Sequence, residues 1–78
     1  MAEFKQVRIK LATINDLKSF VNIVSGYEVD FDIVSGRYTV DAKSLMGLIS
    51  LDLSNPLELR IYSNDTDDIL SDLADYVS

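Results

Sequence analysis

The sequence predicts an α+β fold, an open-faced β-sandwich with the element order β-α-β-β-α-β-α and a four-stranded antiparallel sheet that carries three helices on one face. Apolar residues alternate with polar ones in four short segments, as in strands with one buried face. In three other segments they recur at helical spacing. Strands that each have one apolar face need a single layer of amphipathic helices to cover them.

The first strand and the first helix are expected near the N-terminus. The strand is predicted over residues 7–11, where every second residue is apolar. The helix is predicted by an apolar stripe that consists of Ile14, Leu17, Phe20, Val21 and Val24. Thr13, followed three residues later by Asp16, is typical of a capping box at a helix start. Gly26 is well placed to end this helix.

A β-hairpin is expected next. Residues 27–33 alternate between apolar and acidic side chains, which predicts a strand with one dry face and one wet face. Ser35-Gly36 is a turn signal, and residues 37–41 alternate again as the returning strand. Phe31 lies on the dry face and is therefore expected in the core.

The C-terminal half is expected to add two helices and one strand. Residues 43–51 predict a short apolar helix, and residues 57–62 alternate as the fourth strand. The polar run 64–68 supplies caps and acids for the last helix. The buried stripe of that helix is expected to hold Ile69, Leu70, Leu73 and Val77. The uncovered face of the sheet should be wet and hold Arg8, Lys10, Glu28, Asp30, Asp32, Glu58 and Arg60.

Composition argues against several classes of function. The chain has 78 residues and is expected to form one domain, residues 1–78. Its net charge of -6 argues against binding nucleic acid or a membrane surface. It has neither cysteine nor histidine, so we expect no catalytic nucleophile–base pair, no metal and no cofactor. No membrane-spanning run or signal-peptide pattern is visible, which favours a cytoplasmic protein.

The segment Lys43-Ser44-Leu45-Met46-Gly47 belongs to the short helix that follows the hairpin. It resembles the second-helix motif of the HPr phosphocarrier family, in which Lys-Ser is followed by two apolar residues and often by glycine. The predicted order of elements is also the order of that family, so the resemblance spans nearly the whole chain. It implies a single HPr-like domain.

The other signature of that family is missing. HPr proteins carry phosphate on a histidine between the first strand and the first helix, where an arginine and the helix N-terminus stabilise it. Aligned back from Lys43, Thr13 falls at the histidine position, Asn15 at the arginine and Asp16 at the proline. A looser alignment places Asn15 at the histidine. Neither residue can relay a phosphoramidate, and Asp16 adds negative charge where the phosphate would lie.

Ser44 matches the serine that a dedicated kinase phosphorylates in HPr proteins of Gram-positive-type bacteria. A chain with this serine and without the histidine resembles catabolite repression HPr, a kind of family member that acts as a corepressor of transcription factors. The alternative is that Ser44 only caps its helix. By the same resemblance, the partner-binding surface corresponds to Lys43, Leu45, Met46 and Ile49, while Leu48, Leu51 and Leu53 would face the sheet.

The resemblance therefore implies a non-catalytic regulatory or interaction module that lacks the phosphorylatable histidine and is regulated at Ser44. The expected partner is a protein: a serine kinase of the HPr type, a transcriptional regulator or a phosphotransferase-system protein. Neither nucleic acid nor a membrane is expected as a partner. One alternative stays open, a phosphocarrier component of the phosphotransferase system that uses a non-histidine acceptor. Another is a module of a different pathway that kept only the fold.

Overall fold

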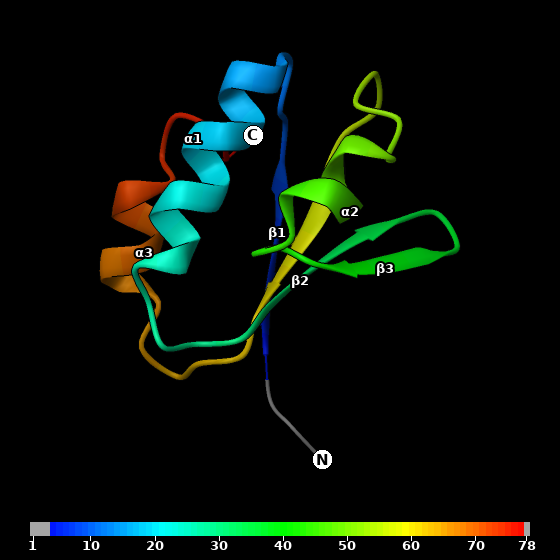
Figure 1. Ribbon diagram of the computed structural model, residues 1–78. Helices are drawn as coiled ribbons and strands as arrows, with labels where there is room; N and C mark the ends of the chain where they lie inside the picture. The colour runs from blue at the N-terminus through cyan, green and yellow to red at the C-terminus, as the bar shows by residue number, and fades with distance from the viewer. Residues whose placement is uncertain (1–3, 78) are drawn as a thin grey trace.

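Four strands form one antiparallel sheet in the order β1-β4-β2-β3. The computed structural model describes residues 4–77, and Figure 1 shows its three helices and four strands. The elements are β1 (Lys5–Ile9), α1 (Ile14–Ser25), β2 (Phe31–Ser35), β3 (Tyr38–Asp41), α2 (Leu45–Ile49), β4 (Leu57–Ile61) and α3 (Asp67–Asp72). The predicted element order and open-faced α+β fold are confirmed.

One face of the sheet packs against the helices. Alternate residues of β2 and β4 are buried, because successive side chains of a strand point to opposite faces. They join the inward residues of the helices in a single core, which holds Ile9, Leu11, Leu17, Phe20, Val24, Phe31, Ile33, Ala42, Leu48, Leu57, Leu59, Ile61, Ile69 and Leu73. Helix α2 lies against both α1 and β3 (Figure 1).

The opposite face of the sheet carries polar side chains that bond across the strands. Arg8 Nε lies 3.5 Å from Glu58 Oε1, and the Tyr62 hydroxyl donates to Asp32 Oδ2 over 3.0 Å. The guanidinium of Arg60 lies over the Phe4 ring, with its central carbon 4.9 Å from the ring centroid. The wet face is thus as expected, except that Glu28 and Asp30 precede the strand and Lys10 follows one.

The second strand begins at Phe31, so the predicted start at residue 27 is wrong. The ladder between β2 and β4 ends at the pair Phe31–Ile61. Beyond it the Tyr62 N–H still donates to the Asp30 carbonyl over 3.1 Å, but residues 27–30 are in no strand pair. The alternation continued into this loop because Tyr27 is half-buried and packs edge-on against the Phe31 ring, with 6.4 Å between ring centroids. A side-chain pattern alone does not show where a strand loses its partner.

The chain ends also differ from the predicted boundaries. Strand β1 spans Lys5–Ile9 rather than residues 7–11. Val77 was predicted to be buried in the last helix, but it is 37% exposed and forms an isolated antiparallel bridge with Ile9. Helix α3 has only 6 residues, and the chain after it turns back to β1. Ile14, predicted in the apolar stripe of α1, is 55% exposed.

Tight turns and caps follow the sequence signals. Gly36 adopts a φ of +59° in the two-residue turn between β2 and β3, while Arg37 keeps a negative φ. Glycine at the first central position is what a type II′ hairpin turn requires. The capping box of Thr13 and Asp16 and the C-cap at Gly26 are both present in α1.

Phe31 is 1% exposed at the centre of the core. We expect Phe31→Ala to lower the free energy of unfolding by about 3–5 kcal/mol, as truncation of a large buried side chain does. Phe4→Ala is the matched control, because Phe4 is 44% exposed and should cost far less. Denaturant unfolding measures both. A loss below about 1 kcal/mol for Phe31→Ala would mean that this strand does not face the core.

The Tyr27 hydroxyl donates a hydrogen bond to the Asp72 carboxylate and so ties the α1–β2 loop to α3. This bond, with smaller effects of burial and of nearby carboxylates, raises the pKa of Tyr27 from 10.0 to about 12. The folded state therefore holds the proton more tightly than the unfolded state. The bond should stabilise fully below about pH 10, and its contribution should be lost as the pH rises through about 12.

This pH dependence can be measured as the difference in melting temperature between the wild type and Tyr27→Phe. We expect the wild type to be more stable at neutral pH and the difference to vanish toward about pH 12. Tyr38→Phe is the control, because Tyr38 is 71% exposed. A Tyr27→Phe difference that stays constant across this range would contradict the assignment.

Candidate functional site

The N-terminus of α1 is closed by two of its own side chains. Thr13 Oγ1 accepts from the Asp16 N–H at 3.1 Å. Asp16 Oδ2 in turn accepts from the N–H groups of Ala12, at 3.1 Å, and Thr13, at 3.2 Å. A helix N-terminus favours negative charge, and here a carboxylate of the chain itself supplies it. Three N–H groups at this helix start are thus already bonded within the chain, and a carboxylate occupies the place beside them.

The two residues aligned with the family phosphohistidine, Thr13 and Asn15, lie at the start of α1. Thr13 is the N-cap residue and Asn15 is an exposed residue of the first turn of α1. Both residues offer oxygen or amide groups only, and the sequence has no imidazole to accept phosphate. Asp16 is partly buried and lies against the helix start, where it would repel a phosphate group.

Ser44 is the N-cap of α2. Its Oγ accepts from the Gly47 N–H at 3.2 Å, and its own N–H donates to the Asp41 carbonyl at 3.0 Å. A Cβ at position 47 would lie 3.3 Å from Ser44 Oγ and 3.6 Å from Val40 Cβ, which is tight. Glycine therefore leaves room beside the hydroxyl. The structure places Ser44 as a helix cap, and this does not conflict with modification of its half-exposed hydroxyl.

Lys43 is directed toward the α1–β2 loop. Its Nζ donates to the Tyr27 carbonyl at 2.8 Å and lies 5.8 Å from the centroid of the Phe31 ring. Its backbone N–H donates to Asp41 Oδ1 at 2.9 Å. In this conformation the ammonium group joins α2 to the loop after α1. Its role in partner binding stays a prediction.

Exposure rises steadily around α2. A helix turns about 100° per residue, so Leu48 and Met46 point to roughly opposite sides, with Leu45 and Ile49 between them. Leu48 is buried, Leu45 is half-buried, Ile49 is 47% exposed and Met46 is 80% exposed. We call Met46 and Ile49, together with the outer edge of Leu45, the α2 patch. Leu51 and Leu53, expected to face the sheet, pack against the core but are only partly buried.

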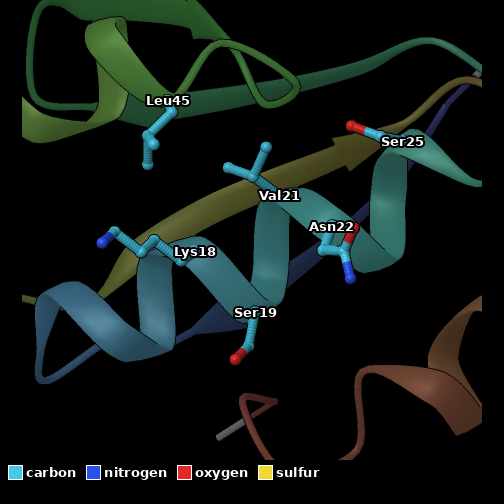
Figure 2. Close-up of a pocket in the computed structure, with 6 residues that line it drawn as sticks. All are labelled: Lys18, Ser19, Val21, Asn22, Ser25 and Leu45. Atoms are coloured by element: carbon cyan, nitrogen blue, oxygen red, sulfur yellow. The ribbon is translucent and has the colours of Figure 1, made fainter.

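Leu45 joins the α2 patch to a shallow groove between the two helices. Figure 2 shows Leu45 pointing from α2 toward α1, with Val21 pointing back toward it. The groove has a volume of about 440 Å³ and is otherwise lined by Lys18, Ser19, Asn22 and Ser25. Its open shape and mixed lining suit a protein surface better than an enclosed small molecule.

Neither a metal-binding cluster nor a membrane-spanning helix is found among the described residues. Within residues 4–77, no group of three or more acidic side chains is arranged to hold a metal ion. No helix of the same range is long and apolar enough to cross a membrane.

The chain is similar to known proteins in both sequence and fold. A profile of the family PTS-HPr, described as "PTS HPr component phosphorylation site", matches residues 17–78. Thr13 and Asn15 lie just before the matched residues. No curated protein is significantly similar in sequence.

Two crystal structures have the same fold. HPr-C-His from Thermoanaerobacter tengcongensis is 26% identical, with a TM-score of 0.76, over 91% of this chain and 88% of that one. A phosphocarrier protein HPr from Bacillus anthracis str. Ames is 25% identical, with a TM-score of 0.72, over 96% and 98% of the two chains.

Proposed function

The chain belongs to the PTS-HPr family, and we propose that it is a non-catalytic regulatory or interaction module of that family rather than a phosphate carrier. The observation that carries this proposal is the contrast between the two helix starts. The start of α1 has no imidazole and is closed by Asp16. Helix α2 keeps Ser44 and presents Met46 and Ile49 to solvent.

Phosphate relay needs an acceptor whose phosphorylated form transfers the group onward. A hydroxyl ester at Thr13 or Ser44 is far more stable than a phosphoramidate and would not pass phosphate on. A carboxylate such as Asp16 could form an acyl phosphate, but it is engaged with two backbone N–H groups. These facts count against the alternative, a phosphocarrier component that uses a non-histidine acceptor.

The α2 patch supports partner binding. Met46 is a large, flexible apolar side chain that is 80% exposed. Exposed apolar side chains that gather on one small helix mark a protein contact more often than scattered ones do. Methionine suits such a surface because its thioether adapts to different partners. The partners proposed are a serine kinase of the HPr type, a transcriptional regulator or a phosphotransferase-system protein, in the cytoplasm.

Phosphorylation of Ser44 is the proposed switch. Ser44 precedes Met46 by two residues, and its Oγ already accepts from the Gly47 N–H, so an ester phosphate would remain beside the first turn of α2. Negative charge there interacts favourably with the helix start. It would also place about two negative charges next to the α2 patch, which changes the affinity for any partner that docks there.

The binding test uses a purified HPr-type serine kinase and a LacI-type regulator from the host, each against the wild type, Met46→Glu and Ser44→Asp. We expect Met46→Glu to weaken binding at least tenfold, because it places a charge in a dry contact. Ser44→Asp should alter binding to the regulator and leave stability nearly unchanged, since aspartate caps about as well as serine.

Ser71→Glu is the matched control, because Ser71 is exposed on α3, on another element. Ser44→Ala tests whether the kinase labels Ser44. Equal binding by the wild type, Met46→Glu and Ser44→Asp would rule out both the patch and the switch.

A further inference from the structure

The outer edge of β3 is free of any neighbour among residues 4–77, since β3 ends the sheet order β1-β4-β2-β3 (Figure 1). Ser35 and Tyr38 flank the two-residue turn, so they form a hydrogen-bonded pair. The Ala42 N–H donates to the Phe31 carbonyl at 3.1 Å, which continues this alternation. Even-numbered residues of β3 therefore bond β2, and the backbone groups of Thr39 and the N–H of Asp41 point outward.

The other edge of the sheet is partly covered. The Lys10 N–H donates to the Tyr76 carbonyl at 2.8 Å, and Val77 bridges Ile9. The chain thus returns along part of the outer side of β1. Among the described residues, β3 is therefore the edge with no neighbouring segment paired along it.

The sequence along β3 is complementary to itself. If two copies of β3 pair antiparallel around Thr39, Arg37, the turn residue just before β3, lies opposite Asp41 of the other copy, and the reverse pair forms on the other side of the axis. Thr39 then faces Thr39, and Tyr38 faces Val40. Opposite charges, threonine pairs and aromatic–β-branched pairs are each favourable across strands. In this pairing the outward N–H and C=O groups of Thr39 in one copy also lie opposite those of Thr39 in the other copy, where they can hydrogen-bond.

A groove on the helix side of β3 could receive the aromatic ring of a second copy. It has a volume of about 320 Å³ and is lined by Tyr38, Val40, Ser50 and Leu51. Tyr38 is 71% exposed in the single chain, although its ring lies on the same side of the sheet as the core. In the antiparallel pair, each Tyr38 would pack on Val40 beside the groove of the other copy.

We propose that this protein forms a twofold symmetric dimer in which the β3 strands pair antiparallel around Thr39 and join the two sheets into one. The twofold axis makes the contact isologous and closed. A contact built on a four-residue strand and one aromatic side chain is smaller than standard stable interfaces. The dimer is therefore weak, with a Kd on the order of 10⁻⁴ M. The pairing uses backbone and side chains of β3 and not Met46, so its tests are independent of the tests of the proposed function.

The first test compares Thr39→Pro with Thr39→Ala by sedimentation velocity up to about 1 mM protein. Proline removes the outward N–H that bonds the second copy, and an edge strand tolerates it there. We expect the wild type and Thr39→Ala to dimerise and Thr39→Pro to remain monomeric. A wild type that is monomeric throughout, or a dimer that Thr39→Pro leaves intact, would overturn the proposal.

The second test uses charge reversal. Arg37→Glu alone and Asp41→Lys alone each place like charges opposite each other twice, so each should dimerise at least tenfold more weakly. An equimolar mixture restores both opposite-charge pairs and should form a heterodimer about as well as the wild type. If Asp41→Lys unfolds, Asp41→Asn keeps the oxygen that accepts from the Lys43 N–H and removes both opposite-charge pairs, so it should dimerise more weakly than the wild type. A mixture that associates no better than the single variants would contradict the pairing.

Discussion

The sheet has one apolar face, and the need to cover it constrains the position of every helix. Phe31, Ile33 and Leu59 lie at the centre of that face and are fully buried, so a shift of one residue in any strand would turn its apolar set toward water. The short α2 covers the sheet with Leu48 and α1 with Leu45. Its 5 residues leave no side from which Met46 and Ile49 could also reach the core. The exposed patch is thus a consequence of how a short helix meets the sheet.

The start of α1 is also shaped by a need of the fold itself, the need of its N–H groups for acceptors. Thr13 and Asp16 supply acceptors to the N–H groups of Asp16, Ala12 and Thr13. That arrangement stabilises the helix by about 1 kcal/mol or more, and it places a negative charge at the point where an external anion would be attracted. A helix start cannot serve both purposes with the same donors. In a family defined by a phosphorylation site, this chain uses those donors for its own stability.

Much of the fold follows from local patterns, whereas its boundaries depend on distant contacts. Alternation identified all four strands, and the caps at Thr13, Gly26 and Ser44 are where the residue types predict them. The start of β2 depends on where its ladder with β4 stops, and the residues after α3 leave the helical pattern because Val77 bridges Ile9 of β1. A local pattern of residue types contains neither contact. For the site, helical periodicity alone could separate Leu48 from Met46. It could not show that the Lys43 ammonium bonds the Tyr27 carbonyl, since 16 residues separate them.

Direct phosphotransfer tests whether the chain relays phosphate. The measurement incubates the protein with phosphoenolpyruvate and the general enzyme of the phosphotransferase system, beside an HPr that has the histidine. We expect label on the control HPr and none on this chain. Label that appears on this chain and passes on to a sugar-specific component would contradict the account, because it would show a working acceptor at a helix start that Asp16 closes.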